Sequence, residues 1–312
     1  MRRVKVKVPA TTANLGPGFD VLALALRLYN TVEIEVGKEK TGKKLQIDIA
    51  GEGKNSLPRD RRNIVYQVAK LVFDKFHFAP DTIRIRLNNR IPLASGLGSS
   101  AAARIGGLVG ANRLCGDRLS REEILNLAAE MEGHPDNVAA AIMGGLVVSC
   151  IVSAKGGRRR IEVVKFNPPQ NLSCVVCIPN FQVMTRKARE ILPKTVKFEQ
   201  AVFTSSRVAM LLSALFQRRY GLLRIAMEDR LHQPYRRRLV KGMEEVFRQA
   251  LLRGALGVSL SGAGPSIFAF APSSRPRLAD RVGRAMQEAF GKYGVESRYL
   301  VLGIDREGTR IS

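Results

Sequence analysis

One stretch of the chain carries the most structural information: Pro92-Leu93-Ala94-Ser95-Gly96-Leu97-Gly98-Ser99-Ser100-Ala101-Ala102. Gly96 and Gly98 permit positive φ angles and a close approach of the backbone to a ligand. Ser99 and Ser100 can cap a helix, and the alanines that follow are strong helix formers. The stretch therefore predicts a loop whose free backbone amides point along the axis of a new helix, an arrangement that attracts phosphate.

Two other interpretations of this stretch have to be weighed. An ordinary capped helix that follows a glycine turn and binds no ligand would show the same residue pattern. The spacing Gly96-x-Gly98-x-x-Ala101 also matches the dinucleotide fingerprint superficially, and Asp117 lies at roughly the expected distance. That aspartate, however, follows a long predicted helix within a Gly-Asp turn instead of ending a second buried strand. A dinucleotide-binding fold is therefore disfavoured.

Two further segments are rich in glycine and other small residues. Residues 9–20, with the sequence PATTANLGPGFD, come directly after the first predicted strand and are expected to form a loop that presents Asn14 and Asp20. Residues 260–268, with the sequence LSGAGPSIF, lie between two apolar strands and read as a second backbone turn. Each segment alone is equally compatible with a purely structural turn.

Composition indicates a folded chain. The 312 residues are 45% hydrophobic and 25% charged, close to the globular average. The longest uncharged stretch after Asn137, residues 138–154, is interrupted by glycines and polar residues and is too short for a bilayer span. Residues 1–8 alternate charge with valine, as a strand does and a signal peptide does not. We therefore expect no membrane partner and a cytoplasmic location.

The net charge of +24, from 51 Lys and Arg against 27 Asp and Glu, makes an anionic partner worth considering. The basic residues are spread in short clusters along the chain, and 6% aromatic residues with no Trp supply few base-stacking platforms. We expect a solvated basic surface and no specific nucleic-acid partner.

The four cysteines include one close pair, Cys174 and Cys177, with the spacing of a metal knuckle. The pair lies within an apolar run that reads as a strand, where the two sulfurs would point to opposite faces. Buried reduced thiols are therefore expected, and a zinc site is disfavoured.

Hydrophobic periodicity predicts a mixed chain. Strands are expected near residues 3–8, 29–36, 45–49, 82–87, 145–153, 161–165 and 172–178, and helices near 63–77, 99–114, 120–132, 195–219 and 238–252. From residue 256 the pattern is strand, helix and strand. The polar stretch from Ser153 to Arg160 is the expected boundary between two lobes, 1–155 and 156–312, although a strand pair running through it fits equally well.

The three glycine-rich segments, in this order and at these separations, resemble the GHMP small-molecule kinases, named for galactokinase, homoserine kinase, mevalonate kinase and phosphomevalonate kinase. The resemblance covers essentially the whole chain. It implies an α+β fold with two lobes: an N-terminal ribosomal-protein-S5-like lobe that binds ATP, residues 1–155, and a C-terminal ferredoxin-like lobe, residues 156–312.

Within these kinases the chain looks most like the homoserine kinases. The motifs that carry this likeness are Pro9–Asp20, Glu132–Asn137, Thr185–Pro193 and Asp229–Arg236. The resemblance implies transfer of the ATP γ-phosphoryl group to the hydroxyl of L-homoserine, a step of threonine biosynthesis, by a homodimer. The chain departs from the pattern at Ala23, Ala94, Arg104 and Lys241, and the sequence offers no explanation for Arg104. The alternatives are a GHMP kinase for mevalonate, a sugar or shikimate, and a basic polyanion-binding protein on the same fold.

The resemblance also implies roles for the nucleotide-binding residues. Residues 92–102 would wrap the triphosphate, Asn63 would touch the adenine, and Ser100 with Glu130 would hold Mg²⁺. Glu132, only two residues from Glu130, is the rival metal ligand. Glu130, Ser100 and Asn137 are the expected catalytic residues.

For the acceptor, the resemblance implies a set of polar partners. Arg189 and Arg236 would bind the carboxylate of homoserine, and Asp20 would hold its ammonium group. The hydroxyl would lie among Asn14, His134 and Asn137. Asp136 reads as the cap of a helix that starts near Asn137, which leaves no obvious catalytic base and favours direct attack by a positioned hydroxyl.

Overall fold

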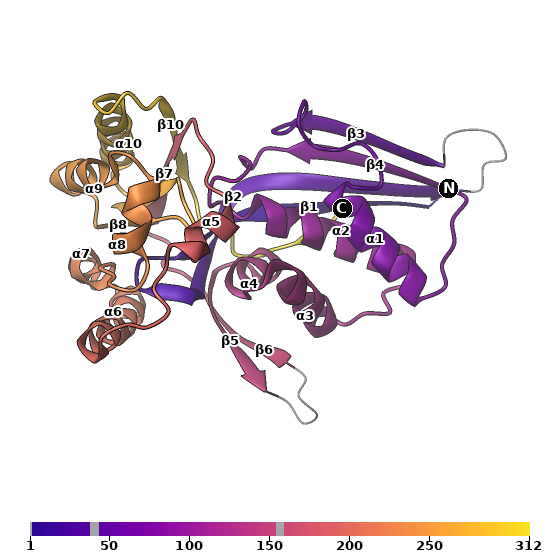
Figure 1. Cartoon of the computed structure of the whole chain (residues 1–312), viewed down its shortest axis with the longest axis horizontal. Coiled ribbons are helices and arrows are strands. Elements are labelled where there is room, and N and C mark those ends of the chain that lie inside the picture. The colour runs from indigo at the N-terminus through magenta and orange to yellow at the C-terminus, as the bar shows by residue number, and fades with distance from the viewer. Residues whose placement is uncertain (1, 38–43, 154–158) are drawn as a thin grey trace.

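The structure is a computed structural model that describes residues 2–37, 44–153 and 159–312. Figure 1 shows two lobes, one built on the long N-terminal strands and the other on the C-terminal half of the chain. Both chain ends lie in the first lobe, because the last strand, β11 (Arg310–Ile311), pairs with β1 (Arg2–Asn14). The predicted two-lobed α+β fold is confirmed.

The first lobe has a seven-stranded sheet in the order β11-β1-β2-β4-β3, with β5 on β2 and β6 on β5. Its strands, besides β1 and β11, are β2 (Gly18–Gly37), β3 (Leu45–Gly51), β4 (Thr82–Asn89), β5 (Leu146–Ser153) and β6 (Arg159–Phe166). Alternation explains the first strand, since Val4, Val6 and Val8 are buried while the residues between them face outward. Four helices accompany this sheet, as Figure 1 shows, and share one core with it.

The four helices are α1 (Ile64–Lys75), α2 (Ser99–Leu114), α3 (Arg121–Glu132) and α4 (Asp136–Met143). The first three match the predicted helices to within a few residues. In α3, Ser120 and Glu123 form a capping box that fixes the start of the helix. The helix predicted near Asn137 begins one residue earlier, and Asp136 accepts the Asn137 backbone N–H at 2.6 Å.

The segment expected to be a loop, residues 9–20, is mostly strand. The prediction is wrong for residues 9–14, because β1 continues to Asn14 and the chain turns only over residues 15–17 before β2 begins. Two register shifts, at Pro9/Ala10 and Ala13/Asn14, bend the strand. Asn14 therefore lies at the end of a sheet strand, with a φ of 72°.

The second lobe has a four-stranded antiparallel sheet in the order β10-β7-β9-β8. Its strands are β7 (Leu172–Pro179), β8 (Gly257–Leu260), β9 (Ile267–Pro272) and β10 (Ser297–Leu302). Two helices, α9 (Met243–Leu252) and α10 (Pro276–Gly291), share a core with one face of the sheet, as in ferredoxin-like folds. The other face joins the core of the first lobe together with α6 (Phe198–Phe216) and α7 (Leu223–Ala226).

The prediction for the cysteine pair is confirmed. Cys174 belongs to the core shared with the first lobe, and Cys177 belongs to the core under α9 and α10. Both thiols are free and buried, and burial raises the pKa of Cys177 to about 12.

The predicted division between residues 155 and 156 lies outside the described residues and stays a prediction. On either side of it, β5 and β6 pair antiparallel in the first sheet, and the second sheet begins with β7 at Leu172. Two short helices at the lobe boundary were not predicted: α5 (Thr185–Glu190) and α8 (Gln233–Arg236). Among the described residues, no helix is long and apolar enough to cross a bilayer.

Candidate active site

The three glycine-rich segments meet where the two lobes touch. Ser261 donates its hydroxyl to the Gly96 carbonyl at 2.8 Å, and the Ser266 N–H donates to the Ser95 carbonyl at 3.1 Å. The Gly262 N–H donates to the Ala13 carbonyl at 3.1 Å. Residues far apart in the sequence thus wall a single cavity of about 80 Å³.

The phosphate loop is built by close backbone packing. Gly96 has a φ of 81°, and a Cβ atom there would lie 2.0 Å from the Ser261 carbonyl oxygen. Gly98 is the N-cap of α2 with a φ of 71°, and no side chain caps this helix end. The amides at the start of α2 therefore remain available to an anion, together with the positive end of the helix dipole.

The residues of the predicted loop divide among three environments. Ala94, Ser95, Gly96, Gly98, Ser99 and Ser100 line the cavity, whereas Leu97, Ala101 and Ala102 are buried in the core beneath it. Pro92 and Leu93 line a neighbouring cleft of about 560 Å³, which Ser95 also borders. The loop thus separates a small polar cavity from a larger cleft.

Asn63 does not line either space. Its side chain is buried, accepts the Val65 N–H at 3.0 Å as the cap of α1, and donates to the Pro58 carbonyl at 2.8 Å. The structure therefore gives Asn63 no open path to an adenine ring. It holds the segment that leads from the second cleft into α1.

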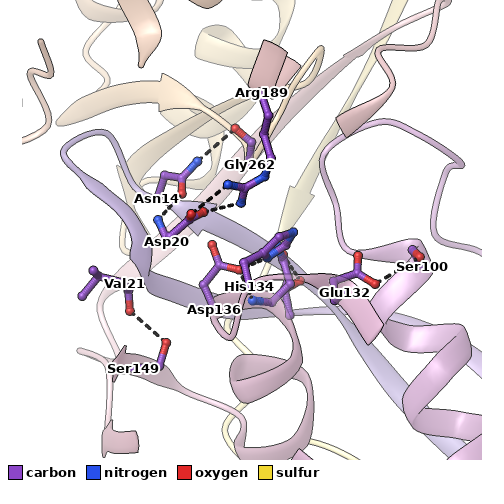
Figure 2. A network of polar contacts seen from close by, with 12 residues as sticks. Asn14, Asp20, Val21, Ser100, Glu132, His134, Asp136, Ser149, Arg189 and Gly262 are labelled. Carbon is purple, nitrogen blue, oxygen red and sulfur yellow. Dashed lines mark hydrogen bonds and ion pairs between the residues drawn. The ribbon is translucent and has the colours of Figure 1, made fainter. Parts of the chain in front are cut away.

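The predicted acceptor-binding residues Asp20 and Arg189 form a forked ion pair (Figure 2). Arg189 Nη1 lies 2.9 Å from Asp20 Oδ2, and Nη2 lies 2.6 Å from Oδ1. Asn14 supports this pair, since its side chain accepts the Asp20 N–H at 3.1 Å and donates to the Gly262 carbonyl at 3.0 Å. The three residues come from β1, β2 and α5, and all of them line the cavity.

Arg236 lies deeper in the same wall and is 2% exposed. It donates to the carbonyls of Ala188 at 3.1 Å and Gly262 at 2.9 Å. Burial, with a smaller contribution from Arg189, lowers the pKa of Arg236 to about 10, so the guanidinium stays charged at neutral pH.

His232, which the sequence analysis did not single out, orients Arg236. Its Nε2 lies 2.7 Å from the Gly16 carbonyl, and its Nδ1 lies 3.3 Å from Arg236 Nη1. A carbonyl only accepts and a guanidinium only donates, so the tautomer with a proton on Nε2 satisfies both contacts. Burial lowers the pKa of His232, which favours this neutral form.

Phe19 is a second residue that the sequence analysis missed. Its ring borders the cavity, with the guanidinium carbons of Arg189 and Arg236 at 5.4 and 5.1 Å from its centroid. Cation–π contacts at these distances keep both guanidinium groups close to the cavity. The only signal in the sequence was its position next to Asp20.

A polar cluster around the start of α4 closes the cavity on the side of the first lobe. His134 Nδ1 lies 2.6 Å from Asp136 Oδ1, and Asn137 Oδ1 accepts the Thr11 hydroxyl at 2.6 Å. Burial disfavours a charged His134, but the hydrogen bond and the negative charge of Asp136 outweigh burial and raise its pKa above 6.5. His134 and Asn137 thus line the cavity as predicted.

The two candidate metal ligands on α3 point in different directions. Glu130 is exposed and does not line the cavity, whereas Glu132 does. The Ser100 hydroxyl donates to Glu132 Oε2 at 3.3 Å (Figure 2), and Arg104 Nη1 lies 2.5 Å from the same oxygen. The geometry therefore replaces Glu130 by Glu132 as the partner of Ser100.

Three other potential ligands, Asp20, His134 and Asp136, also approach one another within 4.8 Å. Their oxygens are already engaged, by Arg189 on Asp20 and by His134 on Asp136, and a cation there would face Arg189. A nitrogen ligand also suits Mg²⁺ less well than oxygen. This group is better explained as a set of ion-paired and hydrogen-bonded side chains that line the cavity.

Gly98 supplies a direct test of the phosphate loop. Gly98→Ala is expected to weaken ATP binding at least ten-fold and to lower stability by about 1–3 kcal/mol, because a Cβ atom would lie 2.1 Å from Thr11 Oγ1 at a positive φ. Calorimetric ATP titration and denaturant unfolding measure the two effects. Gly116→Ala is the control, since Gly116 also has a positive φ but no atom within 4 Å of its Cβ position. Equal ATP affinity in both variants would argue against the loop assignment.

The fold is that of a GHMP kinase. Residues 63–145 match the family model of the GHMP kinases N terminal domain, and residues 211–292 match that of the GHMP kinases C terminal domain. A homoserine kinase of Carboxydothermus hydrogenoformans is 43% identical over 98% of this chain and 95% of its own length. One of Caldicellulosiruptor saccharolyticus is 46% identical over 99% of this chain and 96% of its own.

A solved structure agrees with these relatives. The crystal structure of homoserine kinase from Cytophaga hutchinsonii superposes with a TM-score of 0.86 at 32% identity, covering 100% of this chain and 98% of that one. The chain belongs to the homoserine kinase family.

Proposed function

We propose that this protein transfers the γ-phosphoryl group of ATP to the hydroxyl of L-homoserine, giving O-phospho-L-homoserine and ADP. The observation that carries the proposal is a single cavity in which a free helix N-terminus faces Asp20, Arg189 and Arg236. One end of this cavity suits a polyphosphate, and the other suits an amino acid. We place the reaction in threonine biosynthesis and in the cytoplasm. We also expect the protein to form a homodimer, and light scattering would test this oligomeric state.

ATP is proposed to occupy both sides of the phosphate loop. The amides at the start of α2 would bind phosphate oxygens. The adjacent cleft of about 560 Å³, lined by Pro92, Leu93 and residues of β7 and β10, has room for the nucleoside. Backbone groups at Gly96 and Gly98 would approach the phosphates because no Cβ atom stands in the way.

The donors next to the loop fit a magnesium ion. The Ser100 hydroxyl and a Glu132 carboxylate oxygen lie 3.3 Å apart beside the cavity, and Mg²⁺ prefers oxygen ligands while it keeps several waters. Ser100 and Glu132 would therefore hold it. When bound, the ion would neutralise charge on the β- and γ-phosphates.

The acceptor would enter by replacing one ion pair with two. In the structure Asp20 and Arg189 bind each other. A homoserine zwitterion offers an ammonium group to Asp20 and a carboxylate to Arg189, so both side chains exchange one charged partner for another. Arg236, already fixed by two backbone carbonyls, would add its charge to the carboxylate site.

The acceptor hydroxyl would then lie near His134 and Asn137, between the amino-acid clamp and the phosphate loop. Asp136 is engaged with His134 and with the start of α4, and Asp20 is assigned to the ammonium group. The hydroxyl oxygen would attack the γ-phosphorus directly, the bond to the β-phosphate oxygen would break, and the hydroxyl proton would pass late to an oxygen of the transferred phosphoryl group and from there to water. Positioning and charge neutralisation supply most of the catalysis in such a transfer.

The substrate is tested by an acceptor panel. ADP release is expected to be at least a hundred-fold faster with L-homoserine than with mevalonate, a hexose or shikimate at matched concentrations. Mevalonate has a carboxylate but no ammonium group, so Asp20 would lose its cationic partner on binding. Faster turnover of mevalonate or a sugar than of L-homoserine would overturn the proposed substrate, although the protein would still be a kinase.

RNA binding that is lost at moderate salt, with kinase activity intact, would mark the +24 charge as incidental to function.

A further inference from the structure

Arg104, the departure that the sequence left unexplained, lies at the proposed metal site. It follows Ser100 by four residues on α2, so the two side chains lie on the same face of the helix, one turn apart. One guanidinium nitrogen, Nη1, contacts both the Ser100 hydroxyl and Glu132 Oε2. The side chains of Arg104 and Glu132 are only 18% and 12% exposed, so their ion pair is partly shielded from water, whereas Ser100 is exposed.

The two oxygens that Arg104 contacts are the two that the proposed function assigns to Mg²⁺. A guanidinium is always charged and has only donors, so while it stays on these oxygens it competes with a metal ion for their lone pairs and repels the charge of the ion. We propose that Arg104 is a built-in competitor of the metal ion, which holds Ser100 and Glu132 in the nucleotide-free enzyme and is displaced when Mg²⁺ arrives with the nucleotide. This inference rests on the proposed function.

The position of Glu132 explains why a resident cation is useful there. Glu132 is the last residue of α3, where the negative end of the helix dipole disfavours a carboxylate, and its side chain is nearly buried. Without a cation this carboxylate would be costly to fold. Arg104 neutralises the Glu132 carboxylate before any metal binds and so lowers the free-energy cost of burying it. A metal ion must then break the contacts of Arg104 with Ser100 and Glu132. The chain therefore binds Mg²⁺ more weakly than its oxygen ligands alone would allow.

The test measures metal affinity independently of catalysis. ADP is titrated into the protein by calorimetry, once with excess Mg²⁺ and once with EDTA. The ratio used below is the dissociation constant in EDTA divided by the dissociation constant in Mg²⁺. By thermodynamic linkage, this ratio equals the Mg²⁺ affinity of the protein–ADP complex divided by the Mg²⁺ affinity of free ADP. No substitution in the protein alters the Mg²⁺ affinity of free ADP, so a change in the ratio is a change in the complex. The variants are Arg104→Met, which keeps the length of the side chain, and Arg104→Gln, which keeps a neutral donor should the first fold poorly.

Arg113→Met is the matched control. Arg113 lies on the same helix and pairs with Asp117, but both side chains are about half exposed and far along α2 from Ser100. The ratio is expected to rise about ten-fold in Arg104→Met, by less in Arg104→Gln, and by under two-fold in Arg113→Met. Arg104→Met should also melt at a lower temperature than the wild type in EDTA and gain more from Mg²⁺ with ADP.

The outcomes separate the inference from the proposed function. A ratio in Arg104→Met that falls, or that rises by less than three-fold, overturns the competitor role even if the variant is less stable, since a merely structural residue would change melting alone. In that case ADP binding by the wild type would leave the proposed function standing. A wild-type protein that binds no ADP would overturn both.

Discussion

Glu132→Gln is expected to lower kcat about a hundred- to a thousand-fold, the range seen when one preorganised electrostatic partner of a transition state is removed. The carboxylate of Glu132 lies 3.3 Å from the Ser100 hydroxyl beside the phosphate loop. Glutamine keeps the size of the side chain but removes the negative charge of the carboxylate that we propose as a ligand of Mg²⁺. A coupled assay of ADP release at saturating ATP, Mg²⁺ and homoserine measures the effect.

Glu130→Gln is the control for this prediction. Both glutamates lie in the last turn of α3, but Glu130 is exposed and does not line the cavity, so kcat should stay within two-fold of the wild type. Denaturant unfolding of both variants separates folding from catalysis, and we expect losses below about 2 kcal/mol in each. A larger loss of kcat in Glu130→Gln than in Glu132→Gln would place the metal on the other face of the helix.

This pair of residues illustrates what the sequence could not resolve. With 3.6 residues per turn, positions two apart lie roughly 200° apart around a helix, so at most one of them faces Ser100. The sequence named both and ranked Glu130 first. Glu132 lies three and four residues after the buried Ala129 and Ala128, so the apolar periodicity of α3 is a local signal that favours it over Glu130. The contact between Glu132 and Ser100 itself depends on how α3 packs against α2, which no local pattern gives.

Asn63 shows a second limit. An asparagine before a helix is as suitable for capping as for binding a ligand, and burial separates the two roles here. The side chain is 2% exposed, and it makes one hydrogen bond to Val65 and one to Pro58. Local signals predicted α1 correctly, whereas the contact of Asn63 with adenine stays a prediction that its burial does not favour.

The loops and short helices show where prediction succeeded and failed. Glycine positions in the phosphate loop were correct because their requirement is local: a positive φ and no Cβ atom. Helices α5 and α8 have only six and four residues, too few for a periodic pattern. Their arginines, Arg189 and Arg236, were nevertheless named from the motifs that contain them, and both line the cavity.

The amino-acid clamp gives the other large effect. Arg189→Gln and Asp20→Asn are each expected to raise the KM for homoserine about ten- to a hundred-fold, the loss of a charge-assisted hydrogen bond of about 1.5–3 kcal/mol. The KM for ATP should stay within two-fold. Arg186→Gln is the control, because Arg186 lies on the same helix as Arg189 but is 90% exposed and pairs with Glu190.

Arg236→Gln should raise the KM for homoserine to a similar extent but should also destabilise the fold by about 2–4 kcal/mol, since the carbonyls of Ala188 and Gly262 lose their buried donor. Stability therefore separates the two arginines. Arg189 has its side chain 35% exposed, and its replacement should cost less than about 1.5 kcal/mol.

The double variant Asp20→Asn/Arg189→Gln decides whether these residues bind the substrate or only each other. In the free protein they are one another's partners, so their effects on unfolding should be non-additive, with the double variant losing less stability than the sum of the single ones. On homoserine each side chain would contact a different group, so the effects on KM should multiply to about a hundred-fold or more. If KM in the double variant equals that of either single variant, the pair acts as one structural unit, and the ammonium and carboxylate of the substrate are bound elsewhere.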